Sequence, residues 1–245
     1  MTEKELYDSM NNRENGFVSD KRAGNQALPA LMRKVYIWMT LALTITGVVS
    51  FGIASSPSLI YSLFSHGSTL IILCVAELAL VWWLSSSINK LSLATATGLF
   101  IVYSVLNGVT LSGIFLAYTA SSIANVFFIT AATFGVMALY GYTTKSDLTS
   151  WGKILFMALI GIILATIVNI FVGSSMLDMI ISYAGVLIFV GLTAYDTQKI
   201  KTILSENASD MSEGSQKMAL LGALTLYLDF INLFIYLLRI LGKRN

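Results

Sequence analysis

Two aspartates lie inside apolar stretches of this chain, where a charged side chain needs a specific reason to be present. Asp196 follows Gly191-Leu-Thr-Ala-Tyr near the end of one stretch, and Asp229 lies in the middle of the last one. A carboxylate in a membrane segment is costly unless it is paired, hydrated or protonated. The two aspartates are therefore the best indication of function, and the chemistry they predict is proton sharing or cation binding.

The chemistry depends on whether the two carboxyl groups meet. An antiparallel arrangement of their segments can bring Asp196 and Asp229 to a similar depth. Two carboxylates at close range cannot both ionise at low cost, so the pair would titrate as a unit. With a shared proton the pair can hold two helices together, whereas the doubly ionised pair repels and attracts water or a cation. Carboxylate oxygens suit hard cations such as calcium, so we expect Asp196 and Asp229 to form a transient cation site.

Other polar residues accompany the pair or offer an alternative explanation for it. Asn232 shares a helical face with Asp229, and Glu77 is a third acid in an apolar stretch, so both are candidates for an ion pathway. Asp196 could instead be a solvated charge at the membrane interface, or form an ion pair with Lys199 or Lys201. For Asp229 the nearest basic residue on its own segment is Arg239, about three helical turns away, so it must face protein or water.

The composition places the chain in a lipid bilayer. Of its 245 residues 56% are hydrophobic and 11% are charged, whereas a soluble domain carries about 25% charged residues. The net charge of +2 is too small to indicate a nucleic-acid partner. The single cysteine, Cys74, allows neither an internal disulfide nor a metal framework. The expected partners are lipid, calcium and protons, with no tightly bound cofactor.

The apolar stretches predict seven membrane-spanning helices and therefore an all-α membrane protein. A span needs about 20 mainly apolar residues. The seven candidates are 35–56, 68–88, 92–118, 122–142, 152–173, 179–200 and 219–241. Residues 1–30 are polar and predict a mobile cytoplasmic tail, and 31–245 form the membrane domain. The only long internal loop is expected at about 201–218.

Basic residues predict the orientation. Lysine and arginine collect in cytoplasmic loops, and here they lie before the first span and after the second, fourth and sixth. The loops near 57–67, 119–121 and 174–178 carry none. We therefore expect a cytoplasmic N-terminus. The rule disfavours basic residues outside, and the C-terminal segment carries Arg239, Lys243 and Arg244. The last segment is nevertheless long enough to cross, so we expect the C-terminus outside.

Two long motifs resemble the Bax-inhibitor (transmembrane Bax inhibitor motif) family. They are Gly185-Val-Leu-Ile-Phe-Val-Gly-Leu-Thr-Ala-Tyr-Asp-Thr-Gln-Lys-Ile-Lys201 and Leu221-Gly-Ala-Leu-Thr-Leu-Tyr-Leu-Asp-Phe-Ile-Asn-Leu-Phe234. The stretch Gly141-Tyr-Thr-Thr-Lys-Ser-Asp-Leu148 is similar to the bacterial branch. The resemblance covers roughly 30–243, all seven spans but not the tail.

This resemblance implies a fold, an activity and a site. The fold is six helices around a central seventh, and the activity is a pH-sensitive calcium leak gated by an aspartate pair, which maps onto Asp196 and Asp229. Glu77 is similar in placement to an acidic residue of the family's pore. Some members carry a basic latch residue after the second span, where this chain has only Lys90 as a substitute. The implied location is the bacterial inner membrane.

Other classes of protein also use buried carboxylates. A proton-coupled cation exchanger or small-solute transporter fits the same residues, and an interaction protein that modulates stress responses could use the 201–218 loop and the tail. An intramembrane aspartyl protease fits less well, because Tyr227 stands where its second motif needs glycine. A retinal photoreceptor needs a lysine in the last span, and 219–241 has none. We find no enzyme motif and expect no enzymatic activity.

Overall fold

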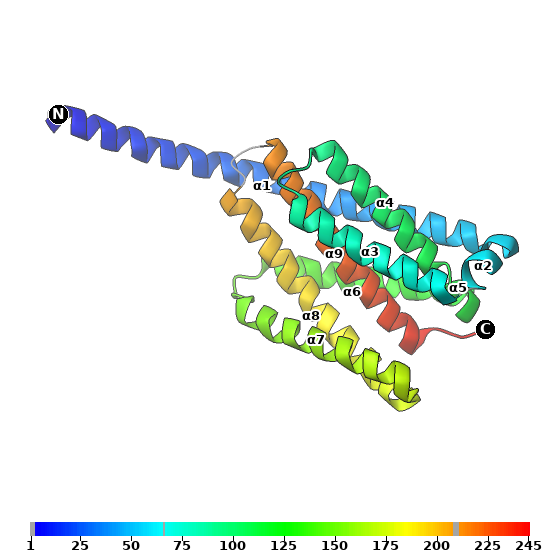
Figure 1. The fold of residues 1–245 in the computed structure, drawn as a ribbon. Coiled ribbons are helices and arrows are strands. Elements are labelled where there is room, and N and C mark those ends of the chain that lie inside the picture. The colour runs from blue at the N-terminus through cyan, green and yellow to red at the C-terminus, as the bar shows by residue number, and fades with distance from the viewer. Residues whose placement is uncertain (1–2, 66, 208–210) are drawn as a thin grey trace.

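The computed structural model describes residues 3–65, 67–207 and 211–245, and within them the chain is an all-α bundle (Figure 1). Seven helical segments are long and apolar enough to cross a membrane, which confirms the predicted fold class. The helices are α1 (Glu3–Ala54), α2 (Pro57–Phe64), α3 (Gly67–Ser87), α4 (Leu93–Leu111), α5 (Ile114–Ala117), α6 (Ala120–Thr143), α7 (Thr149–Val172), α8 (Ser175–Asn207) and α9 (Glu213–Leu241).

The spans agree with the apolar stretches, but three helices run further than predicted. α1 begins at Glu3, so the described part of the 1–30 tail is helical and continuous with the first span, and its mobility stays a prediction. α8 continues to Asn207 and α9 begins at Glu213, so the long loop expected at 201–218 is wrong. Hydropathy marks where a helix leaves the bilayer, not where the helix ends. These helices continue beyond the bilayer as polar helical turns.

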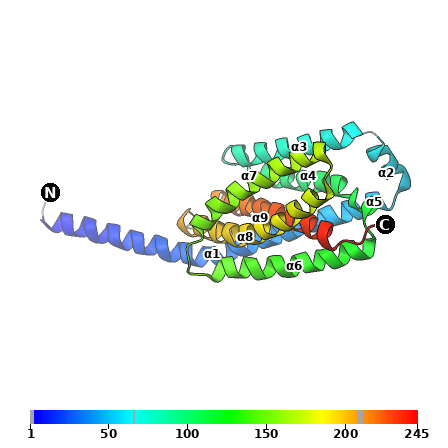
Figure 2. The ribbon, with the colours of Figure 1, turned by 90° about the horizontal axis from the view of Figure 1, so that it is seen from below.

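α9 is the most buried of the seven spans. It packs extensively against α1, α4, α6 and α8 and lies among the other helices in both views (Figures 1 and 2). The main contacts of α3 and α7 are with α4 and α8 respectively. The structure therefore shows four helices packed closely on α9, and a full ring of six around it stays a prediction.

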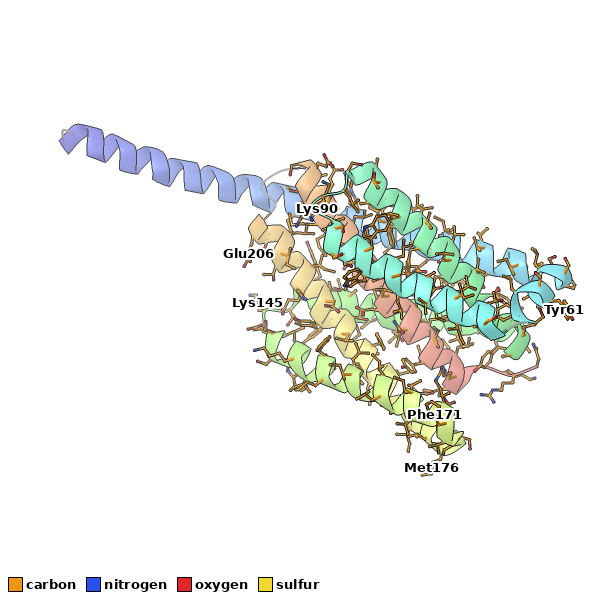
Figure 3. All side chains as sticks on the ribbon, viewed as in Figure 1. Tyr61, Lys90, Lys145, Phe171, Met176 and Glu206 are labelled. Atoms are coloured by element: carbon orange, nitrogen blue, oxygen red, sulfur yellow. The ribbon has the colours of Figure 1, made fainter. Side chains whose placement is uncertain are left out.

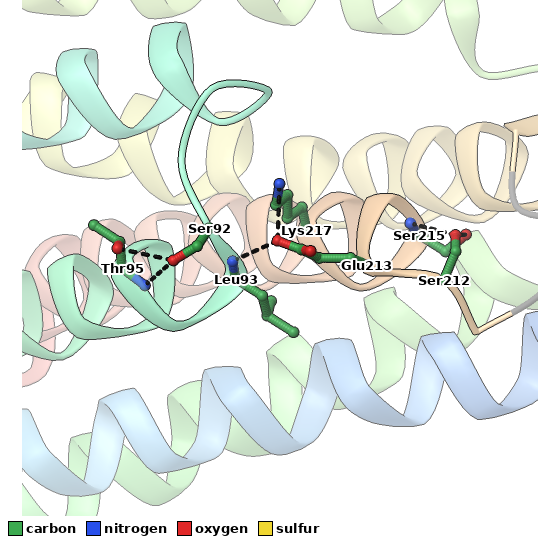
Figure 4. Close-up of polar contacts among 7 residues, drawn as sticks. All are labelled: Ser92, Leu93, Thr95, Ser212, Glu213, Ser215 and Lys217. Atoms are coloured by element: carbon green, nitrogen blue, oxygen red, sulfur yellow. Dashed lines mark hydrogen bonds and ion pairs between the residues drawn. The ribbon is translucent and has the colours of Figure 1, made fainter.

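Polar contacts join the starts of α4 and α9 at one end of the bundle (Figure 4). The Glu213 carboxylate accepts a hydrogen bond from the Leu93 backbone amide at 2.9 Å and pairs with Lys217 at 3.1 Å. Ser92 and Ser212 cap the two helices by accepting from the amides of the residues three positions later. Such caps satisfy amides that have no partner within a helix.

The C-terminus lies at the opposite end of the bundle from these helix starts. Beyond α9 the Lys243 amide donates to Ser122 Oγ at 2.8 Å, and its carbonyl accepts from the Thr119 amide at 3.0 Å. The last helix therefore crosses the whole bundle instead of turning back, as expected. Lys90, Lys145 and Glu206 project at one end of the bundle, and Tyr61, Phe171 and Met176 project at the other (Figure 3).

Candidate functional site

The structure brings Asp196 of α8 and Asp229 of α9 together. Their carboxyl groups lie within hydrogen-bonding reach of each other. Asp229 is only 5% exposed, and its Oδ2 atom has no protein hydrogen-bond donor among the described residues. A bond between two carboxyl groups requires one proton. The geometry therefore fits a pair that holds a shared proton across the α8–α9 contact.

Small residues let the neighbouring helices approach α8 closely beside Asp196. A Cβ atom on Gly141 of α6 would collide with the Ala194 backbone oxygen, and one on Gly152 of α7 would collide with the Tyr195 ring. Close packing of helices in lipid depends on such residues. The two positions directly before Asp196 are thus fixed from two sides, so the carboxyl group has little freedom to move away from Asp229.

A cavity of about 640 Å³ between α7, α8 and α9 contains the pair. Asn232 lines it with the two aspartates, and Lys153 and Lys199 are its basic lining residues. The Asn232 amide donates to the Leu228 carbonyl at 2.8 Å, which leaves its side-chain oxygen as an acceptor. The predicted association of Asn232 with the aspartates is therefore present, and the cavity is large enough for several waters.

A second cavity of about 200 Å³ lies between the halves of α8 and α9 nearest to the loop that joins them. Asp196, Lys199 and Thr225 line both cavities. Asp196 thus lines both the space near the ends of α8 and α9 and the cavity between α7, α8 and α9. A side chain in this position can control passage between them.

Glu77 does not lie in the aspartate cavity. Its carboxylate accepts hydrogen bonds from Thr110 Oγ1 at 2.5 Å and from the Asn107 amide at 3.3 Å, both on α4. Lys90, the expected substitute for a latch, is exposed in the turn between α3 and α4. Lys199 is the basic residue that the structure places beside Asp196.

A buried network that the sequence did not reveal centres on Tyr227. Its hydroxyl donates to Asn107 Oδ1 at 3.0 Å and bonds to Thr46 Oγ1 at 2.7 Å. Through Asn107 the network continues to Glu77, so it joins α1, α9, α4 and α3. Tyr227 precedes Asp229 by two residues, which is about 200° around a helix. α9 therefore carries one polar centre on each of two opposite faces.

The carboxylates alone do not form a resident metal site. No group of three or more histidine, cysteine, aspartate or glutamate residues is arranged to hold a metal within the described ranges. Calcium takes about six to eight oxygen ligands. Asp196, Asp229 and the Asn232 oxygen could supply some of them, and water would supply the rest. This donor set suits an ion in transit, which is the role expected for calcium here.

A family model described as "Inhibitor of apoptosis-promoting Bax1" matches residues 28–245 of the chain. This protein is a member of the Bax inhibitor family. The inner membrane protein YbhL of Escherichia coli strain K12 is 52% identical to it, over 91% of this chain and 94% of YbhL. Uncharacterized proteins of Borreliella burgdorferi and Rickettsia prowazekii are 46% and 43% identical, covering 87% and 93% of this chain and 92% and 95% of their own lengths.

The comparisons agree with the architecture. The chain covers nearly the full length of these relatives. Together with the seven apolar helices, the likeness to an inner membrane protein shows that this Bax inhibitor family member is a multi-pass inner membrane protein.

Proposed function

We propose that this protein is a pH-sensitive calcium leak channel in which Asp196 and Asp229 form the gate. The observation that carries the proposal is that the buried Asp229 carboxyl lies beside the partly buried Asp196 carboxyl, which lines two cavities. With a shared proton the pair holds α8 against α9 and closes the passage between the two cavities. When both carboxyls are ionised, they repel each other and attract water and cations.

The proposed orientation has the N-terminus in the cytoplasm. The turns that carry Lys90 and Lys145 lie at the end where Asp196 borders the smaller cavity. Under the positive-inside rule that end is cytoplasmic. Asp196 would then respond to cytoplasmic pH, and calcium would leave the larger cavity past it.

Calcium flux into liposomes that contain the purified protein tests the gate. In the wild type, flux is expected to rise between pH 5 and pH 8 as the pair ionises. Asp229→Asn keeps the shape and leaves Asp196 as the one ionisable member of the pair, so the repulsion between two carboxylates is lost and the rise of flux with pH should be smaller than in the wild type. Glu206→Gln removes an exposed carboxylate from the same helix as Asp196 and should behave as the wild type.

Each other outcome contradicts part of the proposal. Absence of flux at every pH would exclude the channel and leave the interaction protein as the alternative. Flux that rises with acidity would contradict a latch made by the shared proton, and would favour an ionised pair held by Lys199, which lines the cavity beside Asp196.

A proton-coupled exchanger is the second candidate, because the same pair could carry protons in one direction and calcium in the other. The two functions differ in what drives transport. A leak equilibrates calcium without a pH difference, whereas an exchanger needs an opposing proton gradient. Measuring flux with equal and unequal pH across the liposome membrane separates them.

A further inference from the structure

A long groove lies between α1 and α6. It has a volume of about 650 Å³. Both helices pack against α9, but within the described residues they do not pack extensively against each other. Phe230 of α9 lies among the lining residues, and the buried side chains of Met32, Met39 and Phe134 line it as well. The groove therefore has an apolar interior within the membrane-spanning part of the bundle.

The length and position of the groove match one leaflet of a bilayer. Its lining on α1 runs from Pro29 to Leu43, about 21 Å along a helix. One leaflet with its headgroup zone is about 20–22 Å thick. Pro29 precedes the apolar run that begins at Val35, and Tyr142 lies near the end of α6. The groove thus extends from the membrane surface to about the middle of the bilayer.

The charge in the groove lies at its surface end. Arg33 is the only charged residue among the described residues that line it, and it is exposed. The hydroxyl-bearing side chains of Tyr36 and Tyr142 line the same end. The ion pairs within the described ranges are Lys217–Glu213 and Arg239–Asp178, so Arg33 has no carboxylate partner there. A guanidinium without a carboxylate partner is suited to a phosphate group.

We propose that this groove binds one anionic phospholipid from the leaflet at the N-terminal end of the bundle. An acyl chain lies between α1 and α6, and the phosphate binds Arg33. The apolar lining selects the chain and the single cation selects the phosphate. This site is on a different helix pair from the aspartate cavity, so it does not depend on the proposed channel function.

Two variants test the two halves of the site separately. Arg33→Ala removes the phosphate contact, and Lys145→Ala removes an exposed lysine from the same end of the bundle as its control. Gly135→Leu fills the groove, because a Cβ at Gly135 meets no atom within 4 Å. Gly161→Leu on α7 has the same open surroundings but lies outside the groove, and it is the control for Gly135→Leu.

The measurement is native mass spectrometry of the detergent-purified full chain, titrated with dioleoyl-phosphatidylglycerol, with dioleoylglycerol, or with inorganic phosphate. We expect one phosphatidylglycerol per chain, bound about tenfold more tightly than dioleoylglycerol, which corresponds to about 1.4 kcal/mol. Arg33→Ala should abolish that tenfold preference. Gly135→Leu should weaken both lipids about tenfold. Both control variants should bind as the wild type does.

Several results would overturn the proposal. Equal binding of the two lipids by the wild type would exclude the phosphate contact. Unchanged binding in Gly135→Leu, with a folded protein by size-exclusion chromatography, would exclude the groove. Full displacement of the lipid by inorganic phosphate alone would show a plain anion site. If Arg33→Ala and Lys145→Ala lost equal affinity for phosphatidylglycerol, the lipid would be attracted to the basic surface in general and not to Arg33.

Discussion

Replacing Gly141 by alanine tests how tightly α6 holds α8 beside Asp196. The added Cβ would collide with the Ala194 backbone oxygen and lie 2.8 Å from its carbonyl carbon and 2.9 Å from its Cα. These are backbone atoms, which cannot rotate away as a side chain can. Overpacking of this kind costs about 1–3 kcal/mol, against a gain of about 0.5–1 kcal/mol from replacing glycine by alanine within a helix.

Gly135→Ala on the same helix is the matched control, because a Cβ there meets no atom within 4 Å. The helix gain is common to both variants, so the difference between their free energies of unfolding isolates the collision, at about 1–3 kcal/mol. Gly135→Ala should be slightly more stable than the wild type and Gly141→Ala less stable. For a chain of this size, each kcal/mol changes the midpoint of thermal unfolding by about 2–4 °C.

The assay is unfolding in a fixed detergent mixture, followed by the fluorescence of the four tryptophans. Equal stability of Gly141→Ala and Gly135→Ala would refute the reasoning, because it would show that α6 and α8 can separate without cost. In that case the position of Asp196 could not be attributed to this contact.

Two further variants test contacts away from the aspartate pair. Tyr227→Phe removes the hydroxyl that bonds Thr46 and Asn107, and it should lower the free energy of unfolding by about 1–2 kcal/mol in the same assay; no change would mean that the network contributes nothing. Asp147 accepts hydrogen bonds from Thr149, which hold its pKa below the usual 3.8. A carboxyl with a lowered folded-state pKa stabilises above its unfolded pKa, and that stabilisation is lost as the pH falls through the folded value. Asp147→Asn should therefore reduce the difference in unfolding midpoint between pH 7 and pH 3, and an unchanged difference would contradict the assignment.

The spans and the meeting of the aspartates follow from the sequence for clear reasons. Each span is a long apolar run, and bilayer thickness sets its length. Asp196 and Asp229 lie on consecutive predicted spans, which run antiparallel and can place the two residues at one level even with the long loop that the sequence predicted between them. The sequence does not show which helices meet at Gly141 and Gly152, because glycine occurs at both tight and open positions of these helices.

Other features could not be predicted because they depend on how the helices are arranged around α9. Tyrosine is common in apolar helices, so nothing in the sequence marks Tyr227 as the centre of a buried network. Glu77 lies in an apolar stretch, as an acidic pore residue would. In the structure α3 packs on α4, away from the aspartates. The groove between α1 and α6 belongs to two segments far apart in sequence, and only the fold brings them together.

The two polar centres on α9 indicate which part of the bundle moves if the gate opens. On one face, Tyr227 bonds to residues of α1 and α4, so these helices form one hydrogen-bonded unit with α9. On the other face, the carboxyl pair is a polar link to α8 that is lost when both carboxyls ionise, whereas the Arg239–Asp178 ion pair at 3.3 Å joins the same two helices near the C-terminal end of α9. α7 has its main contacts with α8 and would follow it. Spin-label distances between α8 and α9 should therefore lengthen from pH 5 to pH 8, while α4–α9 distances stay constant. A change confined to α4–α9 would show that the Tyr227 network, rather than the aspartate pair, is the moving contact.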